Sequence, residues 1–343
     1  MVRPAMSATV HPIRGNTPPP SLDPLLALVA SGMQAVNAII LERMQSEVPV
    51  IPALAGHLIA GGGKRLRPML TLASAALLGY EGARHHKLAA AVEFIHTATL
   101  LHDDVVDGSG MRRGKRAANL IWGNQATVLV GDFLFTRSFE LMVEDGSLAV
   151  LRILSAASSI IAQGEVDQLQ ITRQVQVGED RYLGVITAKT AVLFAAACQI
   201  AAVVAEKDAR TEAALESFGR NLGIAFQLVD DAIDYTSDAA TMGKGQGDDF
   251  REGKVTLPVI LAYQRGDAAA RAFWQRTIGQ GDVSESDFAT ALAFMRDARA
   301  IEDTLARARH YGARAKEALA DFPASSARAA MMEAVEFAIA RAY

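Results

Sequence analysis

Residues 94–107 of this chain read FIHTATLLHDDVVD, a run of apolar and small residues that ends in three aspartates. Apolar side chains recur three and four positions apart, which is the spacing of one helix face. The stretch therefore predicts a buried helix that carries carboxylates at its end. Because residues three and four apart share a face, we expect Asp103, Asp104 and Asp107 to point the same way.

A second stretch, residues 223–234, repeats this arrangement as GIAFQLVDDAID and adds the carboxylates of Asp230, Asp231 and Asp234. Like charges at this spacing destabilise a helix unless a cation neutralises them. The six donors are hard oxygens, with no Cys or His at zinc spacing, which favours Mg²⁺. The alternative is a pair of solvated acidic helix ends. Two matched motifs that directly follow apolar runs argue against that alternative.

Basic residues lie at four places: GGGKRLRP at 61–68, RRGK at 112–115, Lys189 followed by Thr190, and Lys244 with Lys254 around a glycine-rich loop. Glycines let backbone amides approach an anion, and arginine and lysine bind phosphate oxygens. Each cluster alone is typical of a solvated loop, but beside two acidic motifs they predict a diphosphate site. The lysine at 64 is followed by Arg65 and no strand precedes it, so this is not a Walker A loop.

Two polar residues share the expected helix faces of the acidic motifs. His96 precedes Asp103 by two helical turns, and Gln227 lies three, four and seven residues before Asp230, Asp231 and Asp234. We therefore expect both side chains to reach the ligand rather than to be ordinary core residues. No Ser-His-Asp order or nucleophile elbow is present, and Cys198 lacks an electropositive setting, so no covalent enzyme intermediate is expected.

The rest of the chain predicts an all-α protein, a single-domain bundle of roughly a dozen helices separated by glycine and proline breakers. Residues 1–21 are expected to form a flexible, Pro-rich tail, and residues 22–343 one domain. A net charge of −4 argues against a nucleic-acid partner. The single cysteine indicates a reducing, cytoplasmic compartment. The longest apolar run, 191–205, is too short for a transmembrane segment and predicts a buried core helix.

These strings resemble the trans-isoprenyl (polyprenyl) diphosphate synthase family. Four further strings add to the resemblance: MRRG at 111–114, GDFL at 131–134, QGE at 163–165 and GKVTLP at 253–258. The resemblance covers nearly everything after the tail. It is closest to the bacterial octaprenyl to decaprenyl diphosphate synthases, which make quinone side chains. It implies the isoprenoid synthase fold, a homodimer, and a Mg²⁺-dependent prenyltransferase that adds isopentenyl diphosphate repeatedly to an allylic diphosphate. The apolar product would allow peripheral membrane contact.

Carried over by position, the resemblance assigns roles to individual residues. It places isopentenyl diphosphate at Lys64, Arg67, His96 and Arg113, and the allylic diphosphate at Arg112, Lys189, Thr190, Gln227, Lys244 and Lys254. It gives magnesium to all six motif aspartates, which act in catalysis together with Arg112 and Lys189. The expected reaction is ionisation of the allylic diphosphate, condensation and elimination, in a dry cavity that protects the allylic cation.

Product length should depend on what blocks the cavity below the first acidic motif. The small residues Ala98 and Thr99 stand there, whereas short-chain members commonly carry an aromatic residue, so a long product is expected. Phe139 or Met142 would form a deeper floor. The alternatives are a short-chain farnesyl or geranylgeranyl diphosphate synthase, a non-catalytic subunit of a heteromeric synthase, and a terpene cyclase. The intact second motif argues against the last two.

Overall fold

The computed structural model describes residues 19–60, 63–112, 114–236 and 246–341, and these are almost entirely helical. The first half of the chain contains α1 (Asp23–Arg43), α2 (Val50–Ala60), α3 (Leu66–Leu77), α4 (Arg84–Val106), α5 (Ala118–Asp145) and α6 (Leu148–Ile171). The second half contains α7 (Glu179–Ile186), the π-helical turn η1 (Thr187–Ala191), α8 (Val192–Val204), α9 (Ala209–Thr236), α11 (Asp248–Glu252), α12 (Leu257–Arg265), α13 (Ala268–Trp274), η2 (Gln275–Gly279), α14 (Asp287–Asp297), α15 (Ala300–Ala318) and α16 (Ser326–Ala340).

The all-α prediction is confirmed, with one small exception in the described part of the chain. Strands β1 (Met111–Arg112) and β2 (Lys115–Arg116) pair antiparallel and form a short hairpin. Gly114 has a φ of 76°, which a glycine adopts without strain. Strands of two residues are too short to produce a period-two pattern, so they could not be predicted from the sequence.

Several helix ends coincide with the predicted breakers. Gly146 ends α5 in the left-handed conformation, with a φ of 76°, and Gly178 precedes the first turn of α7. The sequence did not indicate a kink inside α5, where Gly123 has a φ of 82° and a ψ of 160°. α5 is therefore two helical segments joined at a glycine.

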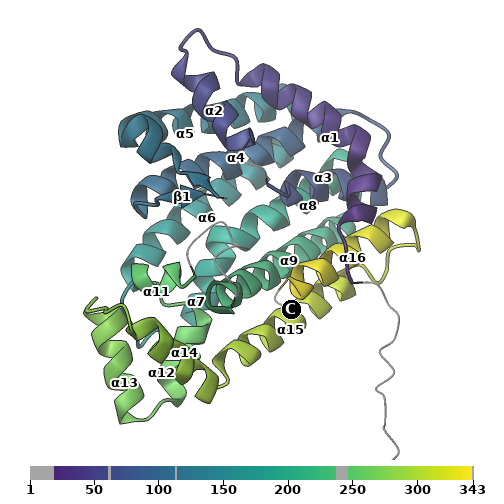
Figure 1. Ribbon diagram of the computed structural model, residues 1–343. Helices are drawn as coiled ribbons and strands as arrows, with labels where there is room; N and C mark the ends of the chain where they lie inside the picture. Colours follow the sequence, from purple (N-terminus) through teal and green to yellow (C-terminus); the bar gives the residue numbers. More distant parts are fainter. Residues whose placement is uncertain (1–18, 61–62, 113, 237–245, 342–343) are drawn as a thin grey trace, which may run out of the picture.

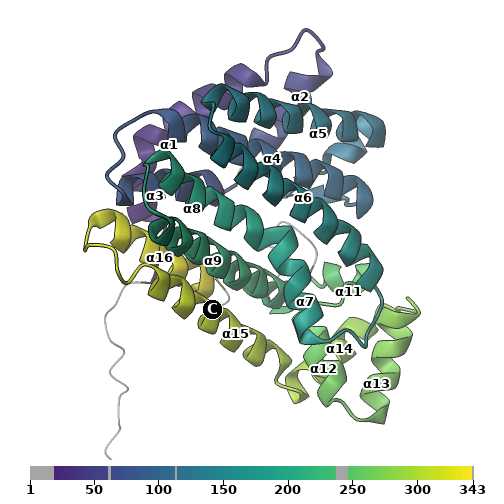
Figure 2. The same cartoon turned by 180° about the vertical axis from the view of Figure 1, so that it is seen from behind.

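The helices pack around two hydrophobic cores (Figures 1 and 2). The larger core joins α1, α3, α4, α5, α6, α8 and α16 to the first half of α9. The smaller core joins α7 and the second half of α9 to the segment from α11 to α15. α9 contributes to both cores, and its second acidic motif lies in the half that belongs to the smaller core.

Three helical stretches are long and apolar enough to span a membrane by length and composition alone: α1, α6 and the run Glu179–Val204. The apolar run at 191–205 is itself shorter than a span, as expected, but it belongs to a longer helical stretch. The turn η1 continues the helix without a break and extends the run to 26 residues. This run is 78% buried in the protein, which agrees with a core helix, whereas the windows in α1 and α6 are 22% and 28% buried.

Candidate active site

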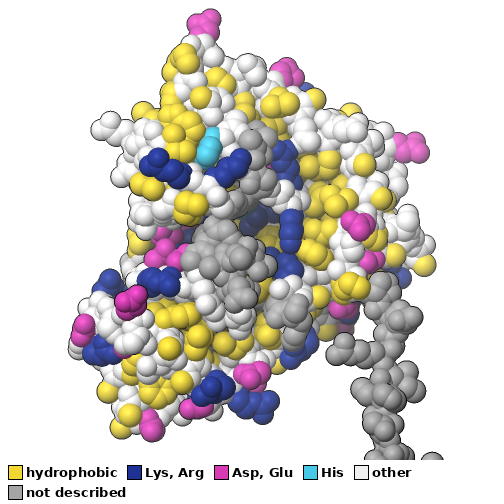
Figure 3. Space-filling view, viewed as in Figure 1, with side chains coloured by type: hydrophobic (Ala, Val, Ile, Leu, Met, Phe, Trp, Pro, Cys, Tyr) yellow, Lys and Arg dark blue, Asp and Glu magenta, His cyan; other side chains and the backbone are white. Residues whose placement is uncertain are grey.

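A cavity of about 670 Å³ receives side chains from both acidic motifs. Figure 3 shows that Lys and Arg side chains gather around the hollow on this face of the molecule. Of the predicted site residues, the cavity is lined by Lys64, Arg67, His96, Thr99, Asp103, Asp107, Arg112, Lys189, Thr190, Gln227, Asp230, Asp231, Asp234 and Lys254. Residues far apart in the sequence thus meet in one place, as the two motifs predicted.

Four predicted residues do not line this cavity. Asp104, Ala98 and Met142 are buried in the protein, and Phe139 is half-buried against the larger core. Two further predictions, Arg113 and Lys244, and most of the predicted tail lie outside the described residues.

The first acidic motif ends α4, and its three carboxylates do not share one environment. Asp103 and Asp107 face the cavity, because residues four apart lie on the same side of a helix. Asp104 is fully buried, and its Oδ1 accepts a hydrogen bond of 2.8 Å from Nε of Arg112. The expectation that Asp104 points the same way is wrong, since adjacent helical residues lie about 100° apart.

The second acidic motif lies near the end of α9, and Asp230, Asp231 and Asp234 all line the cavity. Both oxygens of Asp231 are occupied, since Tyr182 donates to Oδ2 and Gln227 donates to Oδ1 at 2.8 Å. Oδ2 of Asp234 accepts the backbone N–H of Asp249 at 3.2 Å. Asp230 also faces the cavity, where Arg341 lies 2.8 Å from its Oδ1, so Asp230 and Asp234 are the candidate metal-binding carboxylates of this motif.

Each motif carboxylate that faces the cavity has a basic side chain or a backbone donor close by. Nζ of Lys254 lies 2.9 Å from Oδ2 of Asp107, and Nζ of Lys189 lies 3.6 Å from Oδ2 of Asp103. Arg341, from the end of α16, lies 2.8 Å from Oδ1 of Asp230. These ion pairs neutralise the cavity without a ligand. A magnesium diphosphate could replace them, with phosphate oxygens on the cations and the metal on the carboxylates.

Of the basic residues predicted to bind isopentenyl diphosphate, Arg67 contacts His96, and Lys64 lies near Arg341 and Asp230. Nη1 of Arg67 lies 3.1 Å from Nε2 of His96, and its guanidinium stacks on Phe194 at 4.4 Å from the ring centroid. The ammonium of Lys64 lies 4.3 Å from the ring centroid of Phe337. Burial lowers the pKa of Lys64, and the nearby Arg341 lowers it further. This excess of positive charge favours an anion at this end of the cavity.

Lys189 and Thr190 are presented by the π-helical turn η1, which two glycines hold in place. A Cβ on Gly164 of α6 would lie 2.7 Å from Cβ of Ala188, and one on Gly223 of α9 would lie 2.6 Å from Cα of Ala191. Only glycine permits such a close approach of three backbones. π-Helical turns occur frequently at functional sites, and this one places two adjacent polar side chains in the cavity.

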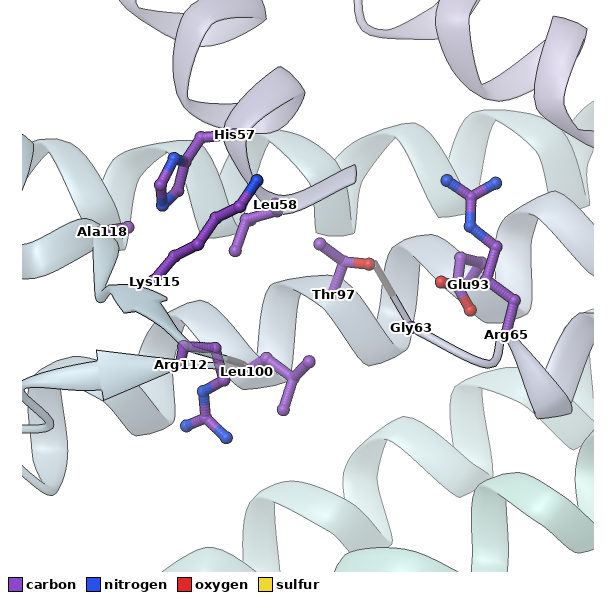
Figure 4. A pocket seen from close by; sticks show the side chains of 10 residues that line it. All are labelled: His57, Leu58, Gly63, Arg65, Glu93, Thr97, Leu100, Arg112, Lys115 and Ala118. Carbon is purple, nitrogen blue, oxygen red and sulfur yellow. The ribbon is translucent and has the colours of Figure 1, made fainter. Parts of the chain in front are cut away.

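A smaller hollow of about 30 Å³ adjoins the cavity and has room for about one water molecule. Figure 4 shows Arg65 beside Glu93 at one end and Arg112 near Lys115 at the other. Its size excludes a diphosphate.

The donor set fits magnesium that shares its coordination with a substrate. In the described ranges, no three His, Cys, Asp or Glu side chains converge into a ready-made metal cage. Mg²⁺ is usually held by one or two carboxylates and by phosphate oxygens. Asp103, Asp107, Asp230 and Asp234 supply such carboxylates on the cavity wall. Asp104 accepts a hydrogen bond from Arg112, and Asp231 accepts hydrogen bonds from Tyr182 and Gln227. Neither is therefore counted among the candidate metal ligands.

We expect the stability of the metal-free protein to fall as the pH rises from about 4 to about 8. Burial raises the pKa of Asp231 from 3.8 to about 7 and that of Asp234 to about 8, and the Asp249 carboxylate adds to both shifts. In this window the folded state holds protons that the unfolded chain has lost, so rising pH favours unfolding. Thermal unfolding in EDTA across this range measures the effect. Saturating Mg²⁺ should flatten the pH dependence, and a stability that increases with pH would contradict the assignment.

Sequence analysis missed several cavity residues. Glu165 accepts a hydrogen bond of 2.7 Å from Lys189, and burial raises the pKa of its carboxyl. Tyr182, Asp249 and Arg341 also line the cavity. A signal existed only for Glu165, which stands in the quoted QGE string. The other three come from α7, α11 and the end of α16, and no local spacing links them to the motifs.

One cavity of this helical protein contains carboxylates for a divalent ion and cations for a diphosphate. This combination defines a class of transferases that act on diphosphate esters. Within this class, the polyprenyl synthetase family profile matches residues 48–295. The chain belongs to this family and is a prenyltransferase.

Comparisons over nearly the full length agree. The chain is 43% identical to octaprenyl diphosphate synthase of Escherichia coli over 321 residues, 94% of this chain and 99% of that protein. Among solved structures, it is similar to a polyprenyl synthase from Caulobacter crescentus complexed with calcium and isoprenyl diphosphate. That match has a TM-score of 0.92 and 53% identity, and covers 94% of this chain and 98% of the other. A decaprenyl diphosphate synthase from Rhodobacter capsulatus matches with a TM-score of 0.90 and 48% identity, over 94% and 100% of the two chains.

Proposed function

We propose that this protein is a Mg²⁺-dependent, long-chain trans-polyprenyl diphosphate synthase that condenses isopentenyl diphosphate repeatedly onto an allylic diphosphate. The observation that carries the proposal is the single cavity, which is lined by carboxylates of both acidic motifs and by the predicted diphosphate-binding cations. Relatives named octaprenyl and decaprenyl diphosphate synthases support an octaprenyl to decaprenyl product, which would serve as a quinone side chain. They favour this function over a short-chain synthase.

Two groups of cavity residues would bind the two diphosphates. Lys64, Arg67 and His96 would orient isopentenyl diphosphate at one end. Arg112, Lys189 and Lys254 would hold the allylic diphosphate and stabilise negative charge as it departs. Magnesium, held by Asp103, Asp107, Asp230 and Asp234, supplies further stabilisation of that charge.

Apolar side chains in the cavity wall protect the allylic cation from water. They come from α4, α6, α7, α8, α9 and the segment after α11, namely Leu100, Ile171, Val185, Ile186, Phe194, Phe226 and Val255. Both aromatic rings among them already carry a guanidinium, Arg67 on Phe194 and Arg341 on Phe226. The released diphosphate is then the acceptor for the proton lost in elimination.

One assay tests the activity and the product class together. Purified protein is incubated with isopentenyl diphosphate, farnesyl diphosphate and Mg²⁺, and the dephosphorylated products are sized by chromatography. We expect octaprenyl to decaprenyl alcohols and no product in EDTA. Products that stop at geranylgeraniol would favour the short-chain alternative. No product under any of these conditions would favour the non-catalytic subunit.

We further propose that two copies associate through α5 and α6, which lie on the face seen in Figure 2. This face exposes large apolar side chains, with Leu129 66%, Val143 67% and Leu148 81% exposed. Val166 and Leu169 continue it along α6, each 57% exposed. A cluster of this kind on a monomer marks an interaction surface, and an isologous contact with a second copy would bury it.

We expect Val143→Glu to convert the dimer into a monomer, because a charge buried in an apolar contact loses its hydration. Light scattering after gel filtration measures the mass, which should fall by half. Val283→Glu, at an exposed valine between η2 and α14, is the matched control and should remain dimeric. A dimeric Val143→Glu protein would exclude this face as the interface.

A reducing cytoplasm is the proposed compartment. Cys198, the single cysteine of the chain, is completely buried in the larger core, and burial raises the pKa of its thiol to about 12. A thiol in this setting is unreactive.

A further inference from the structure

We propose that the hydroxyl of Tyr182 positions the second acidic motif, because it holds Asp231 within the protein so that Asp230 and Asp234 face the cavity. This inference rests on the proposed function, since it concerns how the chain presents carboxylates to magnesium. Tyr182 lies on α7, outside both aspartate motifs and seven residues before Lys189.

The hydroxyl of Tyr182 is one of two neutral donors that share the Asp231 carboxylate. Tyr182 is 2% exposed and donates to Oδ2 of Asp231, which is 3% exposed. Oδ1 accepts from Nε2 of Gln227 at 2.8 Å. The amide of Gln227 is in turn oriented by Thr190, whose Oγ1 donates to Oε1 of Gln227 at 2.8 Å. Each oxygen of Asp231 is thus fixed from a different element of the fold.

The two donors determine which aspartates remain available on α9. A buried carboxylate that loses a donor keeps the full desolvation cost of an unsatisfied oxygen. Without the Tyr182 hydroxyl, Oδ2 of Asp231 would seek another donor or cation, and the nearest open space is the cavity that it already borders. A third carboxylate turned into the cavity would compete with Asp230 and Asp234 for the metal.

The same hydrogen bonds extend to η1, which faces the first acidic motif. Thr190 is adjacent to Lys189 in η1, and Lys189 donates to Glu165 and lies 3.6 Å from Asp103. The route from Tyr182 therefore passes through Asp231, Gln227 and Thr190 to the side chain that faces the first motif. Lys64, Arg67 and His96 take no part in it, so the isopentenyl end should be unaffected.

Tyr182→Phe tests the proposal, because it removes the hydroxyl and keeps the buried ring. Binding of Mn²⁺ in the presence of inorganic pyrophosphate is measured by isothermal titration calorimetry. The Mg²⁺ dependence of turnover and the KM for isopentenyl diphosphate are measured in parallel. Loss of an outer partner of a metal site typically weakens metal binding by 10–100-fold, so we expect about tenfold weaker Mn²⁺ affinity. The half-saturating Mg²⁺ concentration should rise similarly, with the KM for isopentenyl diphosphate unchanged.

Tyr235→Phe is the matched control. Tyr235 is also on α9 and 1% exposed, but its hydroxyl donates to no carboxylate in the described ranges. This variant should bind Mn²⁺ like the wild type, at a melting temperature no lower than that of Tyr182→Phe, because the hydroxyl of Tyr235 is buried without a partner among the described residues.

Three outcomes overturn the inference. Wild-type Mn²⁺ affinity in Tyr182→Phe would reject the positioning role and leave the proposed function intact. An equal loss in both tyrosine variants would assign the effect to core packing. A wild-type enzyme that turns over fully in EDTA would instead refute the magnesium dependence, and the inference with it.

Discussion

Replacing Asp103 by asparagine should lower turnover by about a thousandfold or more, with little change in the fold. Asp103 faces the cavity from the end of α4, opposite Lys189. A metal contributes several kcal/mol of stabilisation to developing charge, and about 4 kcal/mol corresponds to about a thousandfold in rate. Asparagine keeps the size of the side chain and removes its charge. Steady-state kinetics at saturating Mg²⁺ measures the loss.

The stability of Asp103→Asn separates lost chemistry from lost structure. Burial raises the pKa of Asp103, although Lys189 partly opposes the shift. The charged carboxylate therefore opposes folding at neutral pH when no metal is bound, and the neutral amide should unfold at the same or a higher temperature. Lys189 keeps its partner Glu165 in the variant.

Asp132→Asn is the control for the loss of one aspartate. Asp132 is on α5, its side chain is 60% exposed, and it lies 3.2 Å from His102, away from the cavity. Its substitution should leave turnover within about twofold, as is usual for exposed polar contacts. Near-normal activity of Asp103→Asn in excess Mg²⁺ would remove Asp103 from the metal site and undermine the assignment of the whole first motif.

The sequence predicted the site where local helix geometry decides it. Asp103 and Asp107 are four residues apart, so their common face follows from the helical repeat alone. Helical spacing does not place Asp104 on this face, because Asp104 is only one residue from Asp103. It is instead buried against Arg112. The apolar runs before both motifs correctly indicated helices that line a cavity rather than solvated ends.

The sequence did not predict contacts that depend on how distant helices pack. Arg341 reaches Asp230 from a position 111 residues away in the chain, and Tyr182 reaches Asp231 from 49 residues away. The close approach of α6 and α9 to η1 requires Gly164 and Gly223, yet a glycine within a helical pattern is read only as a weak breaker. Such residues are found only when the backbone positions are known.

We expect product length to depend on the wall of the cavity below the first motif, part of which α4 supplies. Thr99 lines the cavity one turn before Asp103, and its Oγ1 donates to the backbone carbonyl of His96 at 2.8 Å. Ala98 is 1% exposed and belongs to the larger core, as does Met142, while Phe139 packs against that core. A growing apolar chain would extend from the cavity into this region. Phe139 and Met142 therefore remain candidates for the floor.

We expect Thr99→Phe to shorten the product by several isoprene units while the first condensation proceeds at close to the normal rate. The phenyl group fills the cavity directly and changes no charge near the diphosphates. Chromatography of the dephosphorylated products gives the length distribution, and single-turnover kinetics with farnesyl diphosphate isolates the first step.

Ala98→Phe should shorten the product in the same direction from the core side of α4. The added ring must displace packed neighbours, at a cost of about 1–3 kcal/mol, so its melting temperature is measured first. If Thr99→Phe alone shortens the product, the wall is formed by the cavity face and Ala98 only supports the helix. If both variants still give full-length product, α4 does not bound the growing chain. The limit would then lie deeper, where Met142→Ala should lengthen the product.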